Sequence, residues 1–311
     1  MLQRALQGGQ ADGMGRALAA SFGIADFVHP LDRSARQQLE VIPLLQPTVK
    51  KYLRAAAERK PRQALLSGAL RLGPRQLPDI FRMLPPICAA FGIGEPELYL
   101  MRGDANARTV GHDRTAIVIY NRLLEDLADD EVEAVLAHEC GHIAAGHVLY
   151  RQMAQALIRA AAPSGAGRSL LTQVPGLASA QIQAALFNWY RKSELTADRA
   201  AVAYLGEADP MQRALFRVMG VPKWLPGEVS YGAYLEQIAE LDQISEAGRW
   251  DRGLAPDLEN GSGHPLAAIR IRELTSWVDS DAFRQLTPTA AGRARPRSRQ
   301  PVADIVSDQR R

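Results

Sequence analysis

The chain has 311 residues, of which 47% are hydrophobic, so it can bury one large core or two modest ones and is neither a disordered nor a fibrous protein. Lysine and arginine together number 37 against 34 acidic residues, which gives a formal net charge of only +3. This small excess argues against a nucleic-acid-binding surface, and we expect no nucleic-acid partner.

The beginning of the chain resembles a targeting peptide only weakly. Arg4 and Arg16 precede a short apolar run, but Asp12 and several early glycines argue against a signal or transit sequence. We therefore expect a disordered leader over residues 1–28.

Residues 29–94 are expected to form a helical N-terminal segment without visible chemistry. Apolar residues recur there at helical spacing, and several prolines, including the pair Pro85 and Pro86, are expected to divide the segment into short helices.

The character changes at residue 95, where two short β-prone runs appear, Glu97 to Met101 and Thr115 to Tyr120. Turn-forming residues separate the second run from residues 107–110, which favours a hairpin. We expect a small mixed sheet at the start of a core that extends to residue 285.

Long helices follow this sheet. A capping box of Asp130 and Glu133 predicts the start of a helix that runs to about Ile158. Residues 162–175, which are rich in Gly, Ser and Pro, are expected to be a flexible loop. Further helices are predicted from about Leu177 to Leu205 and from Pro265 to about Val278, and an arginine-rich, disordered tail is expected over 286–311.

The first of these helices carries a metal-binding pattern. His138 and His142 are four residues apart, so on a helix they lie about 40° apart on one face, where both imidazoles can bind one ion. Glu139 lies beside them, in position to take a proton from a water molecule that a metal ion activates. The pattern predicts a zinc hydrolase, whereas the alternative is two surface histidines beside a solvated glutamate.

A third ligand is expected from the second long helix. Glu194 is an acid on a separate helix, and Asp198 follows one turn later on the same face, where it suits a hydrogen bond to one of the imidazoles. His147 is one position short of the third histidine of metzincins and would face away on a continuous helix. Cys140 is also rotated away from the metal and is interpreted as a core residue.

Four motifs in order resemble the HtpX-like and CAAX prenyl endopeptidase family, metallopeptidase family 48, which belongs to the gluzincins. Residues 136–147 resemble its histidine signature, and Glu194 to Asp198 with Ala200 resemble its acidic helix motif. Asn106 and Ala107 resemble its Asn-Ala strand. The remaining match is His264-Pro265 with Arg270-Ile271, so the resemblance covers about residues 95–275.

The resemblance implies a mostly helical α+β fold, with a zincin-like core whose small mixed β-sheet packs on the active-site helix beneath a helical N-terminal layer. It implies one Zn2+ per chain, bound by His138, His142 and Glu194, with Glu139 as the catalytic base. It further implies that His264 lies near the metal and stabilises an oxyanion. The strand at Asn106 and Ala107 would bind an extended peptide by β-strand addition.

The chain departs from this family in its apolar segments. HtpX and the CAAX endopeptidases are integral membrane proteins, whereas no stretch here approaches 18 consecutive apolar residues, so we expect no transmembrane helix. Cys88 and Cys140 are the only cysteines, which indicates a reducing compartment, and we expect a soluble, cytoplasmic protein. Prenyl-protein processing and membrane-protein quality control are therefore not implied.

The sequence predicts a zinc-dependent endopeptidase that acts on peptide or protein substrates. A second hypothesis is a catalytically latent, metal-binding regulatory or chaperone-like protein of the same fold. A third is zinc-dependent hydrolysis of a non-peptide amide. The sequence does not give the oligomeric state.

Overall fold

The computed structural model describes residues 22–56, 59–111, 114–161, 168–221, 229–244 and 267–290. Helices dominate these residues, and their short strands form one mixed sheet. The expected fold class, a mostly helical α+β protein with a zincin-like core, is confirmed.

The sheet has the strand order β1-β2-β4-β3. β2 and β4 pair in parallel, while the outer pairs, β1 with β2 and β3 with β4, are antiparallel. The expected hairpin is therefore present, with Thr109 opposite Ile117. The short strand β1 was not predicted, because two residues carry no periodicity. The strands are β1 (Leu70–Arg71), β2 (Glu97–Met101), β3 (Ala107–Val110) and β4 (Ala116–Tyr120).

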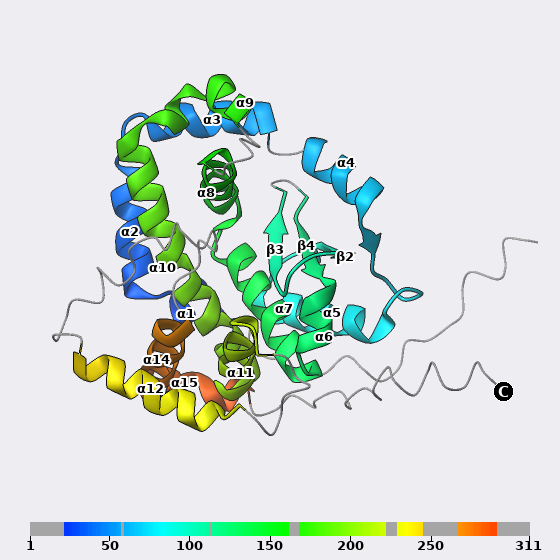
Figure 1. Ribbon diagram of the computed structural model, residues 1–311, viewed down its shortest axis with the longest axis vertical. Helices are drawn as coiled ribbons and strands as arrows, with labels where there is room; N and C mark the ends of the chain where they lie inside the picture. Colours follow the sequence, from blue (N-terminus) through cyan, green and yellow to red (C-terminus); the bar gives the residue numbers. More distant parts are fainter. Residues whose placement is uncertain are drawn as a thin grey trace, which may run out of the picture.

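Helix α7 (Asp129–Ala144) lies against the sheet, where it contacts β3 (Figure 1). Its N-terminal cap differs from the prediction by a small shift in position. The carboxylate of Glu131, and not that of Glu133, accepts a hydrogen bond from the backbone N–H of Ala128 at 2.8 Å. The helix consequently begins at Asp129.

Helix α5 (Pro78–Phe91) packs on α7 and continues through Pro85 and Pro86, although these prolines predict an interruption. A proline inside a helix removes one backbone hydrogen bond and costs about 3 kcal/mol. The apolar face of α5 is fully buried in the core, and this burial outweighs the local penalty. Its completely buried members include Ile80, Leu84 and Ile87.

Helix α10 (Ala180–Leu205) runs between α7 on one side and α2 (Pro30–Glu40) on the other (Figure 1). Its first half belongs to a hydrophobic cluster with α2, in which Leu39 and Trp189 are completely buried. Its second half belongs to the cluster around α5 and α7. Glu194 and Asp198 lie on α10 where these two clusters meet.

The helices before the sheet form the N-terminal layer, with the bounds α1 (Ile24–Phe27), α2 (Pro30–Glu40), α3 (Leu45–Ala56) and α4 (Arg59–Gly68). The described residues before the expected boundary at residue 29 are already part of the fold. Phe22 and Phe27 are buried, and their rings pack on that of Phe91. Residues 22–28 therefore belong to the core and not to a disordered leader.

Two other expected loops are partly helical. Within residues 162–175, α9 covers Arg168–Gln173, and α15 extends to Ala290, beyond the expected start of the tail. No helix in the described ranges combines enough length with enough apolar character to cross a membrane. The remaining elements are α6 (Asn121–Asp126), α8 (Val148–Ala161), η1 (Pro175–Ala178), α11 (Asp209–Val218), α12 (Tyr231–Ile244), α14 (Ala267–Val278) and α15 (Asp281–Ala290).

Candidate metal centre and active site

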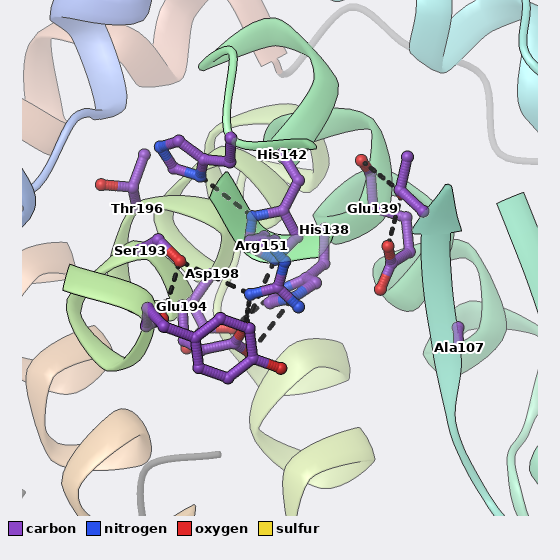
Figure 2. A network of polar contacts seen from close by, with 12 residues as sticks. Ala107, His138, Glu139, His142, Arg151, Ser193, Glu194, Thr196 and Asp198 are labelled. Atoms are coloured by element: carbon purple, nitrogen blue, oxygen red, sulfur yellow. Dashed lines mark hydrogen bonds and ion pairs between the residues drawn. The ribbon is translucent and has the colours of Figure 1, made fainter. Parts of the chain in front are cut away.

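Two histidines on successive turns of α7 face one carboxylate on α10. His138, His142 and Glu194 are all buried, and one potential ligand atom of each lies within 4.8 Å of the others. The Nε2 atoms of His138 and His142 lie 3.6 and 3.5 Å from the carboxylate oxygens of Glu194 (Figure 2). The structure thus brings together the three side chains that the sequence nominated as ligands.

A glycine on α7 lets the two helices approach closely enough for this arrangement. A Cβ atom at Gly141 would lie only 2.5 Å from Cβ of Ala200 and 3.4 Å from Cα of Ala197. The helices therefore cross through small residues, because any side chain at Gly141 would force them apart. This close crossing places the acidic side chains of α10 beside the histidines of α7.

Asp198 orients the first histidine. Its Oδ1 lies 2.9 Å from Nδ1 of His138, and Arg270 on α14 donates to both of its oxygens at 2.7 and 2.6 Å. Burial raises the pKa of Asp198, but the Arg270 guanidinium outweighs burial and holds this pKa below its ordinary value. An ionised carboxylate only accepts hydrogen bonds, so Nδ1 of His138 carries the donated proton and Nε2 faces Glu194.

The two histidines have opposite protonation tendencies. Burial disfavours the charged form of His138, but the hydrogen bond to Asp198 and the nearby carboxylate of Glu194 outweigh burial and raise its pKa to about 9. Burial and the charge of Arg151 instead hold the pKa of His142 well below its ordinary value. A metal ion at this site would therefore compete with a proton on His138, whereas it would bind His142 without displacing a proton from a charged ring.

The Nε2 atom of His142 provides the test of whether a metal ion fits. Among the described residues this buried nitrogen has no hydrogen-bond partner, and such an atom is costly in a protein interior. Two imidazole nitrogens and a carboxylate are ligands that zinc accepts in hydrolases. The donor set and the unpartnered nitrogen fit a metal ion bound between α7 and α10.

The chain turns sharply after this histidine. Gly146 has φ +69°, a left-handed conformation that glycine adopts readily, and it separates α7 from α8. The predicted continuous helix from Asp130 to Ile158 is therefore wrong. Because of this break, His147 does not face away from the candidate metal position. Its Nδ1 lies 3.0 Å from Nδ1 of His142.

Two buried arginines compensate the charge of Glu194. Arg151 on α8 donates through Nη1 to Oε1 of Glu194, and Nη1 of Arg270 lies 3.4 Å from Oε2. A buried carboxylate requires such partners, because burial of an isolated charge is very costly. The arginines thus hold the carboxylate where its oxygens lie 3.6 and 3.5 Å from Nε2 of His138 and His142.

Glu139 points from α7 toward the sheet. Figure 2 shows it directed at the strand that carries Ala107, which is β3. There the hydroxyl of Thr109 donates to Oε2 of Glu139 at 2.6 Å. Glu139 is only 3% exposed, and it directly follows His138 on α7.

The predicted substrate-binding residues lie at the start of β3. Asn106 caps the strand, since its Oδ1 accepts from the backbone N–H of Ala107 at 2.8 Å and its carbonyl accepts from that of Tyr120 at 3.0 Å. β3 is an edge strand of the described sheet and contacts α7. His264 lies outside the described residues.

Sequence reasoning missed several polar partners of this site. Thr109 had a signal, because the two-residue period of a strand places it on the same face as Ala107. Arg151 had none. His147 ends the histidine signature, but its contact with His142 depends on the break at Gly146. Arg270 was noted in the sequence, but its bidentate contact with Asp198 was not anticipated.

Comparisons with known proteins agree with this geometry. The sequence model of peptidase family M48 matches residues 74–278. The plastoglobule-localized metallopeptidase 48, chloroplastic, of Arabidopsis thaliana is 27% identical over 270 residues, which cover 85% of this chain and 76% of that protein.

Bacterial relatives match a shorter region. Protease HtpX homologs of Leptothrix cholodnii and Variovorax paradoxus are 29% and 28% identical over 162 and 158 residues. These alignments cover 44% and 42% of this chain and 55% and 54% of the relatives, so the chain spans about half the length of these two proteins. No solved structure is significantly similar.

Proposed function

The chain belongs to peptidase family M48 and is a metalloprotease, and from this premise we propose that it is a zinc-dependent endopeptidase. His138, His142 and Glu194 would hold the ion. The observation that carries the proposal is the convergence of their ligand atoms within 4.8 Å in a buried position.

Zinc is the metal that suits this donor set, because two imidazoles with one carboxylate leave a coordination position open, as catalytic zinc sites require. When bound, zinc supplies Lewis-acid chemistry that activates water and polarises the scissile carbonyl. The proposed site uses no thiolate ligand, and Cys140 is completely buried in the hydrophobic core.

The protein's own residues then move the protons. Glu139 is the general base that takes a proton from the attacking water and later delivers it to the leaving amine. Thr109 holds the carboxylate in place through its 2.6 Å hydrogen bond, while Asp198 keeps the tautomer of His138 fixed. His264 remains our candidate for oxyanion stabilisation, on the resemblance alone.

The substrate is a peptide or a protein segment in an extended conformation. Residues Asn106 to Val110 form an edge of the sheet beside α7, and an extended peptide could add to this edge by main-chain hydrogen bonds. We expect the pairing of the peptide with β3 to begin near Ala107. The plastoglobule location belongs to the plant relative, and a cytoplasmic location stays our prediction for this chain.

A peptide-library digestion tests the proposal. Wild-type protein should cleave peptides internally, a chelator should stop cleavage, and added zinc should restore it. Glu139→Gln should retain its zinc but lose at least about 100-fold in kcat, because the amide cannot accept a proton. Wild-type turnover by Glu139→Gln would show that the assigned base is wrong.

A further inference from the structure

A buried chain of polar contacts leads from the candidate metal centre to the N-terminal layer. Nδ1 of His142 lies 3.0 Å from Nδ1 of His147, and Nε2 of His147 lies 3.1 Å from Oδ2 of Asp32 on α2. All three residues are at most 1% exposed. These contacts connect His142, a proposed ligand, with Asp32, which lies more than a hundred positions earlier in the sequence.

The donor and the acceptor of each of these contacts follow from the charge of Asp32. An ionised Asp32 can only accept, so His147 must carry its proton on Nε2, which leaves Nδ1 of the neutral ring as an acceptor. His142 must then carry its proton on Nδ1. This tautomer leaves the lone pair of His142 on Nε2, which is the nitrogen that faces Glu194 and has no hydrogen-bond partner among the described residues.

Asp32 is itself held in place by α10. The hydroxyl of Thr196, which lies between Glu194 and Asp198 in the sequence, donates to Oδ2 of Asp32 at 2.6 Å. The backbone N–H of His29 donates to the same hydroxyl at 3.0 Å. The N-terminal layer is thus fixed to the helix that carries the proposed third ligand.

We infer that Asp32 is a positioning residue of the metal centre, which acts through His147 to fix the tautomer and orientation of His142. The inference rests on the proposed function in one respect, that His142 binds zinc. It goes further because Asp32 lies outside residues 74–278, the range that the family model matches. An N-terminal helix outside that range would therefore contribute to metal binding.

Zinc affinity of the full chain tests this inference. Residues that hydrogen-bond to metal-binding histidines typically change metal affinity about 10- to 100-fold when mutated. Asp32→Asn keeps the size of the side chain but removes its charge. The Asn amide has a donor nitrogen in place of one of the two acceptor oxygens of Asp32. We expect its apparent zinc Kd, measured by competition with a chromophoric chelator at constant pH, to rise by at least about tenfold.

Glu273→Gln is the matched control. His29 Nε2 lies 3.2 Å from Oε2 of Glu273, so this substitution weakens a second tie of the N-terminal layer without touching the chain to His142. Its zinc Kd should equal that of the wild type. Equal weakening by Glu273→Gln and Asp32→Asn would overturn the inference, because general loosening of the layer would then explain both.

Two further readouts separate a positioning role from a structural one. The visible absorption bands of the Co2+-substituted protein should shift in Asp32→Asn and stay unchanged in Glu273→Gln. In wild-type protein, 15N NMR of the histidine rings should show the Nε2–H tautomer of His147, a measurement that does not depend on any variant folding. The Nδ1–H tautomer of His147 would refute the inference.

Wild-type zinc binding distinguishes this inference from the proposed function. If wild-type protein binds no zinc, or if His142→Ala binds it as tightly as the wild type, the proposed function itself is wrong. If wild-type protein binds zinc through His142 and Asp32→Asn binds it equally well, only the inference about Asp32 fails.

Discussion

Thr109 and Glu139 form the contact on which the proposed chemistry depends most closely at the scale of single residues. The threonine hydroxyl donates to Oε2 of the glutamate at 2.6 Å, inside a site that excludes most solvent. A hydrogen bond to a charged group contributes about 1.5–3 kcal/mol. Its loss would leave Glu139 able to accept a proton but less well placed to do so.

We therefore predict that Thr109→Val lowers kcat about tenfold, an effect equivalent to about 1.4 kcal/mol of transition-state stabilisation. Steady-state peptide cleavage and zinc content measure the effect, and the zinc content should not change. Thr275→Val is a suitable control, because it removes an exposed 2.9 Å hydrogen bond with Gln212 between α14 and α11 that does not involve Glu139. A Thr109→Val enzyme with full kcat would contradict the role assigned to the hydroxyl.

The sequence predicts some residues of the site better than others, for a physical reason. His138, Glu139 and His142 share one helix face, so their geometry follows from the helical period alone. Glu194 and Asp198 could be paired with them because an acid one turn from another supplies both a ligand and a hydrogen-bond partner. Thr109 lies on a strand whose two-residue period places it on the same face as Ala107, but which residue of that face meets Glu139 depends on packing that the sequence does not show.

Among the elements, the crossing of α7 and α10 determines whether the ligands meet. Gly141→Ala would place a Cβ atom 2.5 Å from that of Ala200, so the helices must separate. Overpacking of a core typically costs about 1–3 kcal/mol. We predict that the variant loses this much stability and also binds zinc more weakly, because Glu194 moves away from His138 and His142.

Thermal or chemical denaturation and zinc titration of Gly141→Ala measure the two effects. Gly68→Ala is the control, since a Cβ atom at the end of α4 meets no atom within 4 Å. The control should retain wild-type zinc affinity. If Gly141→Ala binds zinc as tightly as the wild type, the close crossing is not what positions the ligands.

Element boundaries were predicted well where the hydrophobic period was strong and poorly where tertiary contacts decide. The long helix that carries Glu194 was expected to begin near Leu177, and α10 begins at Ala180. The break at Gly146 was missed because a single glycine inside a helical pattern is often tolerated. At Pro85 and Pro86 the sequence predicts a break that the structure does not have, because core packing keeps α5 helical through both prolines.

For the whole molecule, the contact between the N-terminal layer and the C-terminal helices predicts a pH-dependent contribution to stability. The hydrogen bond with His29 lowers the pKa of Glu273 from its ordinary value of 4.5. A carboxylate whose pKa is lower in the folded state stabilises the protein above its unfolded pKa, and this contribution is lost as the pH falls through the folded pKa.

In metal-free protein, Glu273→Gln should therefore reduce the free energy of unfolding by at most about 1 kcal/mol at pH 7, because the carboxylate is partly exposed and screened by solvent. The difference from the wild type should shrink as the pH falls below 4.5. Urea denaturation at several pH values measures it. A difference that stays constant or grows toward acid pH would contradict the assignment of this contact.

The overall architecture could be inferred from sequence because helical periodicity and turn composition agree over most of the core. The contribution of the N-terminal layer could not, because Asp32 carries no motif, and only packing places it against His147. The sequence consequently predicted a layer without chemistry, whereas the structure places one of its carboxylates within reach of the proposed metal centre.

Zinc content together with zinc-edge X-ray absorption of wild-type protein and Glu194→Ala tests whether His138, His142 and Glu194 together bind one zinc ion. We expect one zinc per wild-type chain, with only nitrogen and oxygen neighbours at about 2.0–2.2 Å, and loss of most zinc in Glu194→Ala. A metal-free wild-type protein, a sulfur neighbour, or an unchanged zinc shell in Glu194→Ala would contradict this expectation.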